Sequence, residues 1–287
     1  MSADPPRPPT IAIHGWGLYE FDLDDQLKIA SERGFEAMDV GSGDLGYGVR
    51  VEATRLANDP VECDRIAGLA AENGVRLTDM FVATPVPIND LSDEARLRNH
   101  EVVEGLARNA ARIGLPGFTF SPGTYASVEW ADAFELAATE LRALVDIGSR
   151  HDVAIRVEPH VHSVADTPDR AQELVEAVPG LTFTLDYSHF VAAGFDQDAL
   201  EPLHRYGTHW HARQARLGRL SIEVDQGTID FRRLLAQLRK ERYEGAIAVE
   251  YVRAAWEGQD QVDVHAENAR MADELRRLIA EFWPDDG

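Results

Sequence analysis

The feature that most constrains the fold is a regular alternation of two sequence textures from Thr10 onward. Short apolar runs rich in β-branched residues alternate with longer segments whose apolar residues recur at helical spacing. This alternation is typical of βαβ units, which build a parallel sheet covered by helices. Eight such units follow one another in 287 residues, with no low-complexity stretch between them. Because a barrel of eight strand–helix units occupies about 250 residues, the sequence predicts an α/β protein with a single (β/α)8 TIM barrel.

The predicted domain covers residues 11–287 and follows a Pro-rich tail, residues 1–10, that we expect to be disordered. The predicted strands are 11–14, 35–40, 75–82, 117–120, 153–158, 181–186, 206–211 and 245–250. The predicted helices are 21–33, 61–72, 93–113, 129–150, 168–178, 197–205, 231–242 and 261–282. The alternative fold is a doubly wound open sheet. It is disfavoured because Gly41-Ser42-Gly43 is only a fragment of the dinucleotide-binding motif G-x-G-x-x-G.

The charge of the chain excludes several classes of partner. The 50 Asp and Glu residues outnumber the 28 Lys and Arg residues, which gives a formal net charge of −22. A surface this negative repels nucleic acid and anionic membranes, so we expect neither as a partner. No apolar run reaches the roughly 18 residues that span a bilayer, and the first residues do not resemble a signal peptide. With Cys63 as the single cysteine, we expect a cytoplasmic protein.

Four successive predicted strands end on side chains that can bind a metal ion. These residues are Glu158, Asp186, His211 and Glu250, and their spacings run from 25 residues (Asp186 to His211) to 39 residues (His211 to Glu250). Each spacing is the size of one strand–helix unit. Barrel enzymes carry their chemistry at the carboxyl ends of the strands, so we expect the four side chains to converge near the barrel axis.

This set of side chains predicts a site for one divalent cation. Three clustered carboxylates repel one another unless a cation compensates their charge. Mixed oxygen and nitrogen ligands suit Mn²⁺, Mg²⁺, Co²⁺ or Zn²⁺ with positions left for water or substrate, and we favour Mn²⁺. A structural zinc site would more often use thiolates, so a functional metal site is the better interpretation.

The same constellation resembles the sugar phosphate isomerase/epimerase superfamily, the xylose isomerase-like barrels. The resemblance runs over nearly the whole barrel and is most specific in its second half. The motifs that carry it are Val157-Glu158-Pro159-His160, Leu185-Asp186-Tyr187-Ser188-His189, His209-Trp210-His211-Ala212-Arg213, Gly227-Thr228-Ile229-Asp230-Phe231 and the segment from Tyr243 to Tyr251. The family often shows H-x-K-D after the seventh strand, where this chain has His211-Ala212-Arg213-Gln214.

The resemblance implies a metal-dependent sugar isomerase or epimerase that enolises a ketose or keto-sugar. In this superfamily the residues at the positions of Glu158, Asp186, His211 and Glu250 hold one divalent ion. In its epimerases the two glutamates also exchange the proton, which implies Glu158 and Glu250 as the acid/base pair. The resemblance implies that His189 contacts the substrate. It also implies a dimer or tetramer, and nothing in the sequence fixes the number.

Further substrate contacts are expected from loops and strand ends. His160 lies two residues after Glu158, and Arg213 lies on the loop after the seventh strand, where a cation binds a substrate hydroxyl or phosphate. Trp16, on a Gly-flanked loop, is the best candidate for an apolar wall against a sugar, with Phe81 and either Trp210 or Tyr251 as further candidates.

Three other functions compete with the isomerase. A lyase or dehydratase acting on a keto-inositol or 3-keto-glycoside uses the same enolate chemistry and is the main alternative. A trinuclear nuclease needs more ligands than the early strands supply, since their ends at His14, Val40, Val82 and Phe120 offer one obvious ligand. A non-catalytic binding protein is disfavoured by the intact set of four metal-binding side chains.

Overall fold

Eight parallel strands close into a barrel in which each strand pairs with its neighbours in sequence and β8 pairs with β1. The computed structural model describes residues 6–254, 259 and 261–284. The strands are β1 Thr10–His14, β2 Ala37–Gly41, β3 Arg76–Phe81, β4 Gly117–Phe120, β5 Ala154–Val157, β6 Thr182–Asp186, β7 Gly207–Ala212 and β8 Ala246–Val249. This closed sheet confirms the predicted fold class, with every predicted strand in place.

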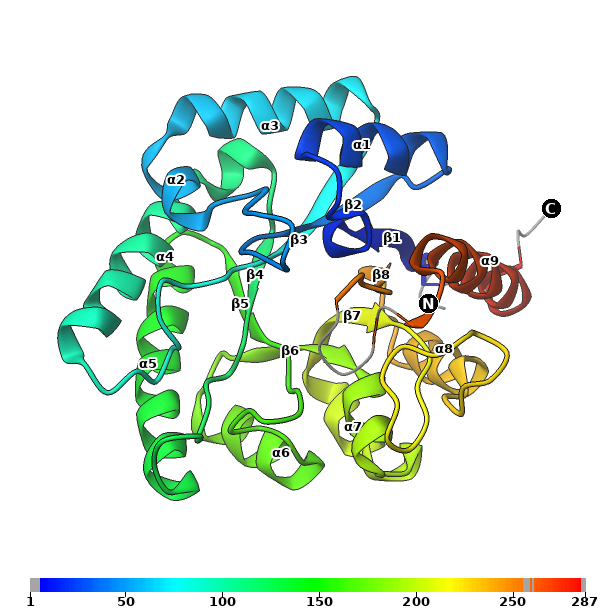
Figure 1. Cartoon of the computed structure of the whole chain (residues 1–287). Coiled ribbons are helices and arrows are strands. Elements are labelled where there is room, and N and C mark those ends of the chain that lie inside the picture. Colours follow the sequence, from blue (N-terminus) through cyan, green and yellow to red (C-terminus); the bar gives the residue numbers. More distant parts are fainter. Residues whose placement is uncertain (1–5, 255–258, 260, 285–287) are drawn as a thin grey trace, which may run out of the picture.

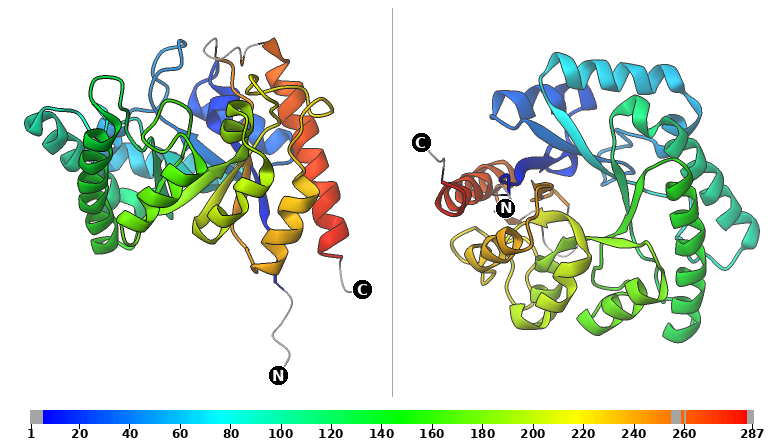
Figure 2. Two further views of the ribbon diagram at one scale, coloured as in Figure 1. Left: turned by 90° about the horizontal axis from the view of Figure 1, so that it is seen from below. Right: turned by 180° about the vertical axis from the view of Figure 1, so that it is seen from behind.

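Helices surround the strands on the outside of the barrel (Figure 1), and the views in Figure 2 show the same ring from below and from behind. They are α1 Leu23–Glu32, α2 Ala53–Asn58, α3 Pro60–Glu72, α4 Asp93–Ile113, α5 Trp130–Arg150, α6 Pro168–Ala177, α7 Tyr187–Ala193, α8 Phe231–Lys240 and α9 Val264–Phe282. Local signals set several of their ends. Ser92 caps α4, and Thr167 caps α6 ahead of Pro168 at its first position.

The unit that follows β6 differs from the prediction. Periodicity predicts its helix over 197–205, but these residues lie in two 3₁₀ segments, Gln197–Ala199 and Glu201–Tyr206. The α-helix of this unit is α7, which directly follows the strand because the Asp186 side chain accepts a hydrogen bond from a backbone N–H of its first turn. It ends at Gly194, whose φ of 98° is in the left-handed region. The short helix α2 is a further element that the sequence pattern does not predict.

The interior of the barrel contains polar side chains that bond across it. Thr119 of β4 and Thr184 of β6 lie 2.5 Å apart through their hydroxyls. Arg156 of β5 donates to Asp79 of β3 at 2.8 Å. Since neither pair belongs to neighbouring strands, these side chains lie inside the closed sheet. Barrel interiors are more often filled by branched apolar residues, so this polar filling sets the barrel apart.

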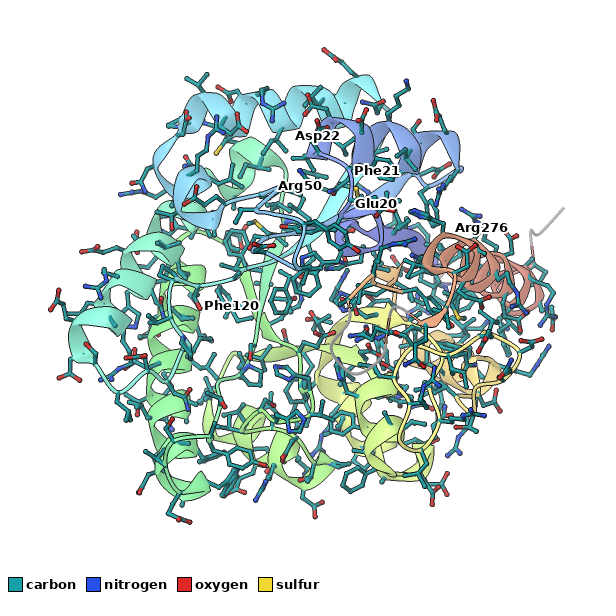
Figure 3. All side chains as sticks on the ribbon, in the orientation of Figure 1. Glu20, Phe21, Asp22, Arg50, Phe120 and Arg276 are labelled. Atoms are coloured by element: carbon teal, nitrogen blue, oxygen red, sulfur yellow. The ribbon has the colours of Figure 1, made fainter. Side chains whose placement is uncertain are left out.

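The loops after β1 and β2 are bonded to each other at the carboxyl face. Arg50 donates through Nε to the Tyr19 carbonyl and through Nη2 to the Glu20 carbonyl, each at 3.1 Å. Figure 3 labels Arg50 and Glu20 in this region. The Tyr19 hydroxyl donates to the carbonyl of Gly43. These bonds fix the loop that carries Trp16, one of the predicted substrate contacts.

The beginning of the chain leads into β1. Residues 1–5 of the predicted tail lie outside the described residues, and Arg7 donates to Glu244 through its backbone N at 3.1 Å and its Nε at 3.2 Å. The division into a tail, 1–10, and a barrel domain, 11–287, stays a prediction. Within the described part of the chain, no helix is long and apolar enough to cross a membrane.

Two helix-interior glycines test the packing of the outer ring. A Cβ on Gly105 of α4 would lie 2.6 Å from the Ala57 carbonyl of α2, whereas a Cβ on Gly68 of α3 would meet nothing within 4 Å. We expect Gly105→Ala to lower the free energy of unfolding by about 1–3 kcal/mol through overpacking. Gly68→Ala, the matched control, gains up to about 1 kcal/mol from helix propensity. Urea unfolding of both variants measures the difference, and equal effects would contradict the close approach of α2 and α4.

Candidate functional site

The four predicted metal ligands lie together at the carboxyl end of β5 to β8. Glu158 directly follows β5, Asp186 is the last residue of β6, His211 lies near the end of β7, and Glu250 directly follows β8. Parallel strands bring their carboxyl ends to one face of the barrel, which is why neighbouring strands place these side chains side by side. All four residues are buried.

His211 lies between the two glutamates. Its Nδ1 is 2.7 Å from Glu158 Oε1 and 3.3 Å from Glu250 Oε2. Ligand atoms of Glu158, His211 and Glu250 lie within 4.8 Å of one another, and the same holds for Glu158, Asp186 and His189. Glu158 belongs to both groups, so it joins all the predicted ligands into one cluster with His189 at its edge.

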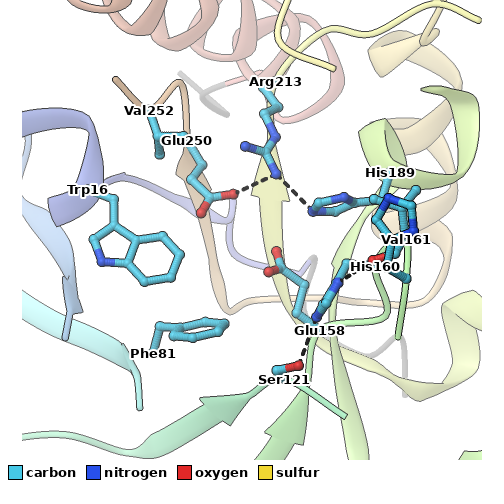
Figure 4. Close-up of a pocket in the computed structure, with 11 residues that line it drawn as sticks. Trp16, Phe81, Ser121, Glu158, His160, Val161, His189, Arg213, Glu250 and Val252 are labelled. Carbon is cyan, nitrogen blue, oxygen red and sulfur yellow. Dashed lines mark hydrogen bonds and ion pairs between the residues drawn. The ribbon is translucent and has the colours of Figure 1, made fainter. Parts of the chain in front are cut away.

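Arg213 extends into this cluster and is fully enclosed by protein, with 2% of the residue exposed. Its Nε donates to Asp186 Oδ2 at 2.8 Å, and its Nη1 donates to Gln259 Oε1 at 2.7 Å. Its Nη2 lies 2.9 Å from His189 Nε2 and 3.3 Å from Glu250 Oε2. Figure 4 shows the guanidinium pointing toward Glu250 and His189. The predicted substrate contact is therefore also a positive charge inside the metal cluster.

Burial and mutual contact shift the protonation of this cluster. Burial, followed by the charge of Glu250, raises the pKa of Glu158 to about 7. Burial also favours a neutral Glu250, but the positive charges of Arg213 and His211 lower the pKa of Glu250 below its usual range. Burial opposes a charged His211 too, yet Glu250 and Glu158 raise its pKa well above the ordinary value. Without a bound metal ion, the negative charge of the carboxylates is thus balanced by bound protons and by the positive charge of Arg213.

The donor set fits a divalent cation. Glu250 Oε2 is buried and has no hydrogen-bond partner among the described residues, although it faces His211 and Arg213. Three carboxylate oxygens and an imidazole nitrogen match the preference of Mn²⁺ and similar ions. A divalent ion together with Arg213 would supply three positive charges against three carboxylates, so no extra proton would be needed.

A cavity of about 390 Å³ opens beside the cluster and contains all four predicted substrate contacts. Trp16 and Phe81 form one wall, with ring centroids 4.5 Å apart, and His160 and His189 lie across from them in Figure 4. The cavity is lined by Trp16, Phe81, Ser121, Glu158, His160, Val161, His162, His189, Arg213, Glu250 and Val252. An aromatic wall that faces polar side chains suits a molecule with one apolar face and several hydroxyls.

His160 is fixed in one tautomer by its neighbours. Its Nδ1 lies 2.7 Å from the Val161 carbonyl, which can only accept, so Nδ1 carries the proton. Its Nε2 then accepts from the Ser121 hydroxyl at 2.8 Å. Burial lowers the pKa of His160, in agreement with a neutral ring. His160 and Ser121 together form a polar corner of the cavity.

Comparison with models of known protein families shows which family the chain belongs to. The family model described as "Xylose isomerase-like TIM barrel" matches residues 27–280. The chain belongs to this family. The comparison with curated protein sequences finds no match.

Solved structures of similar fold are named for different activities. The 3-keto-D-glucoside 4-epimerase of E. coli has a TM-score of 0.70 and 19% identity, over 94% of this chain and 99% of that one. The probable 3-DHS dehydratase AsbF of Bacillus anthracis has a TM-score of 0.69 and 15% identity, over 93% and 98%. The IOLI protein, solved with a zinc atom, has a TM-score of 0.72 and 15% identity, over 96% and 99%.

Two predicted wall residues do not line the cavity of this xylose isomerase-like barrel. Trp210 packs against Tyr187 and His204, with ring centroids 5.8 and 4.7 Å away. The Tyr251 hydroxyl lies in the core and accepts from the backbone N of Gln214. Period-two alternation explains the first result, because Trp210 lies between two histidines that point into the barrel.

Sequence reasoning missed several residues of the site. Ser121 follows β4, whose predicted end at Phe120 is apolar, so nothing marked it. His162 lies two residues after the predicted contact His160 and was not singled out. Asp39 of β2 contacts both His209 and His211 from the opposite side of the barrel. A charged residue within the apolar strand Ala37–Gly41 was the available signal for it.

The position of Trp16 depends on the absence of a side chain at Gly41, since a Cβ there would overlap the indole ring. We expect Gly41→Ala to push Trp16 out of the cavity and to shift the tryptophan emission maximum to longer wavelength. The same substitution in a Trp16→Phe background should leave the emission unchanged, which separates Trp16 from the other tryptophans. An unshifted spectrum in Gly41→Ala would contradict the contact.

Proposed function

We propose that this protein is a divalent-metal-dependent isomerase or epimerase that acts on a ketose or keto-sugar through an enediolate. The observation that carries the proposal is the placement of Glu158 and Glu250, two carboxylates from β5 and β8 that line the same cavity and both approach His211 Nδ1. Moving a proton between neighbouring carbons, or from one face of a carbon to the other, requires groups that remove and return it within one site.

The residues that would hold the ion are Glu158, Asp186, His211 and Glu250. When bound, the ion supplies Lewis-acid stabilisation for the negative charge that develops on substrate oxygen. Mn²⁺ is the proposed ion, with Mg²⁺, Co²⁺ and Zn²⁺ as alternatives. The zinc atom named for the similar IOLI structure supports a divalent ion in this protein.

The protein's own groups perform the proton transfer. One of the pair Glu158 and Glu250 removes the proton from the carbon next to the carbonyl, and the other returns a proton. His189 and Ser121 offer polar atoms to the substrate hydroxyls, His160 orients the Ser121 hydroxyl, and Trp16 and Phe81 cover the apolar face of the substrate.

The proposed substrate is an uncharged sugar. Arg213 is the one Lys or Arg among the described residues that line the cavity, and its guanidinium is already bonded to Asp186, Gln259 and His189. A phosphate group would find no free Lys or Arg among these described lining residues. We therefore assign a free keto-sugar rather than a sugar phosphate. Its location in the cytoplasm and its assembly as a dimer or tetramer remain predictions from sequence.

The second candidate is a lyase. The dehydratase among the similar structures supports it, because removing a proton next to a ketone also begins the expulsion of a β-substituent. The same two glutamates would act, with the returned proton going to the leaving group.

The acid/base assignment is tested by Glu158→Gln and Glu250→Gln. Each substitution preserves size but removes a proton-transferring group, so turnover should fall by about 10²–10⁴-fold. The melting temperature of each variant, measured without metal, should show that the barrel still folds. Turnover within threefold of wild type would refute the role of the substituted residue.

The reaction class is tested by the products. The Mn²⁺-loaded protein, incubated in D₂O with free ketoses and with 3-keto-glucosides, should incorporate deuterium at carbon and yield an isomer of unchanged composition. A product smaller by water or by an alcohol, seen by mass spectrometry, would replace the isomerase assignment by the lyase. Parallel incubation with ketose phosphates should give no turnover, and preferential use of the phosphates would overturn the assignment of an uncharged substrate.

A further inference from the structure

A buried carboxylate lies behind the metal cluster, on the side away from the cavity. Asp39 of β2 has no exposed surface and does not line the cavity. Across the barrel, His209 and His211 of β7 are two residues apart, so both point inward. Asp39 therefore reaches β7 from a strand that is not its neighbour in the sheet.

Each oxygen of Asp39 has a defined partner. Oδ1 accepts from the Thr78 hydroxyl at 2.5 Å. Oδ2 lies 2.6 Å from His209 Nε2 and 3.5 Å from His211 Nε2. The Thr78 hydroxyl and the His209 imidazole thus hold the Asp39 carboxylate in place, and its remaining contact is with the imidazole of His211.

The two nitrogens of His211 consequently face different surroundings. Nε2 faces Asp39, while Nδ1 faces Glu158 and Glu250. When a divalent ion occupies the Nδ1 side, where Glu158 and Glu250 lie, the Asp39 carboxylate would hold the imidazole proton on Nε2 and leave the Nδ1 lone pair for the ion. It also fixes the rotation of the ring, because the ring cannot turn without losing this contact.

We propose that Asp39 is a positioning residue for the metal site: it orients His211 and keeps its proton on Nε2, so that Nδ1 is the atom that binds the divalent ion. The inference rests on the proposed metal site and extends it to a strand, β2, that contributes no ligand. His209 and Thr78 hold Asp39 in place and do not themselves bind the ion.

The same three side chains, Asp39, His209 and His211, also satisfy the spacing of a metal-binding group. A second ion there is the weaker interpretation. Both oxygens of Asp39 already have partners within the protein, and all three residues are buried.

The test uses Asp39→Asn and a matched control, Asp79→Asn. Asp79 is equally buried on the next strand, but it bonds to Thr119 and Arg156 and not to His211. Mn²⁺ is titrated into chelator-treated protein by calorimetry. Asp39→Asn should weaken Mn²⁺ binding by about 10–100-fold, the usual effect of losing such a partner. Asp79→Asn should lower the melting temperature but leave Mn²⁺ affinity within twofold of wild type.

A second readout follows the geometry of the ion. The visible absorption spectrum of the Co²⁺-loaded protein should change in Asp39→Asn and not in Asp79→Asn. If Asp39→Asn does not fold, Thr78→Val, which removes one support of Asp39 at constant size, replaces it and should weaken Mn²⁺ binding at least threefold.

Three results would overturn the proposed role of Asp39. Unchanged Mn²⁺ affinity in the Asp39 variant, or in the Thr78 variant where that replaces it, overturns the inference and leaves the metal site intact. An equal loss in Asp79→Asn overturns it as well, because the effect would then be one of barrel packing. A wild-type protein that binds no divalent ion overturns both this inference and the proposed function.

Discussion

The buried charge of three carboxylates is the constraint on which the rest of the structure depends. Glu158, Asp186 and Glu250 meet at one end of the barrel, where each uncompensated ion would cost several kcal/mol. In the protein alone, Arg213 and a protonated His211 offset part of this charge, and a proton on Glu158 offsets more. A divalent ion would take over the part played by those protons, so its binding must release protons.

The polar filling of the barrel provides the rigidity that such a cluster needs. Bonds such as Arg156 to Asp79 and Asp39 to His209 connect strands of the closed sheet that are not neighbours. A site whose ligands sit on strands braced in this way keeps its geometry better than one built on loops. The interior thus serves the chemistry at its carboxyl end and is more than a means of burying apolar surface.

The sequence predicts features that depend on residues close together in the chain better than features that depend on contacts between distant residues. Strand ends are local features, and alternation along the chain is enough to predict that the four proposed metal ligands lie at them. Asp39 could not be found in this way, since its partner His209 is 170 residues away and meets it only because the barrel closes. Asp186 shows a second limit. Its role as cap of α7 moved the helix of that unit next to the strand, and hydrophobic periodicity alone did not reveal this.

Where the family often has the Lys of an H-x-K-D pattern, this chain has Arg213, which bonds other residues of the site and holds them in place. Its planar fork directs three different nitrogens at Asp186, Gln259 and His189, whereas an ammonium has a single nitrogen. Because Gln259 follows β8 while Asp186 ends β6, the guanidinium connects the loop after one strand to the end of another. The next residue acts similarly, since both ends of the Gln214 amide bond the backbone of Ile229 and hold the loop after β7. Because both residues are bonded to the protein, a ligand in the cavity would meet the aromatic wall of Trp16 and Phe81 and the Ser121 hydroxyl that bonds His160.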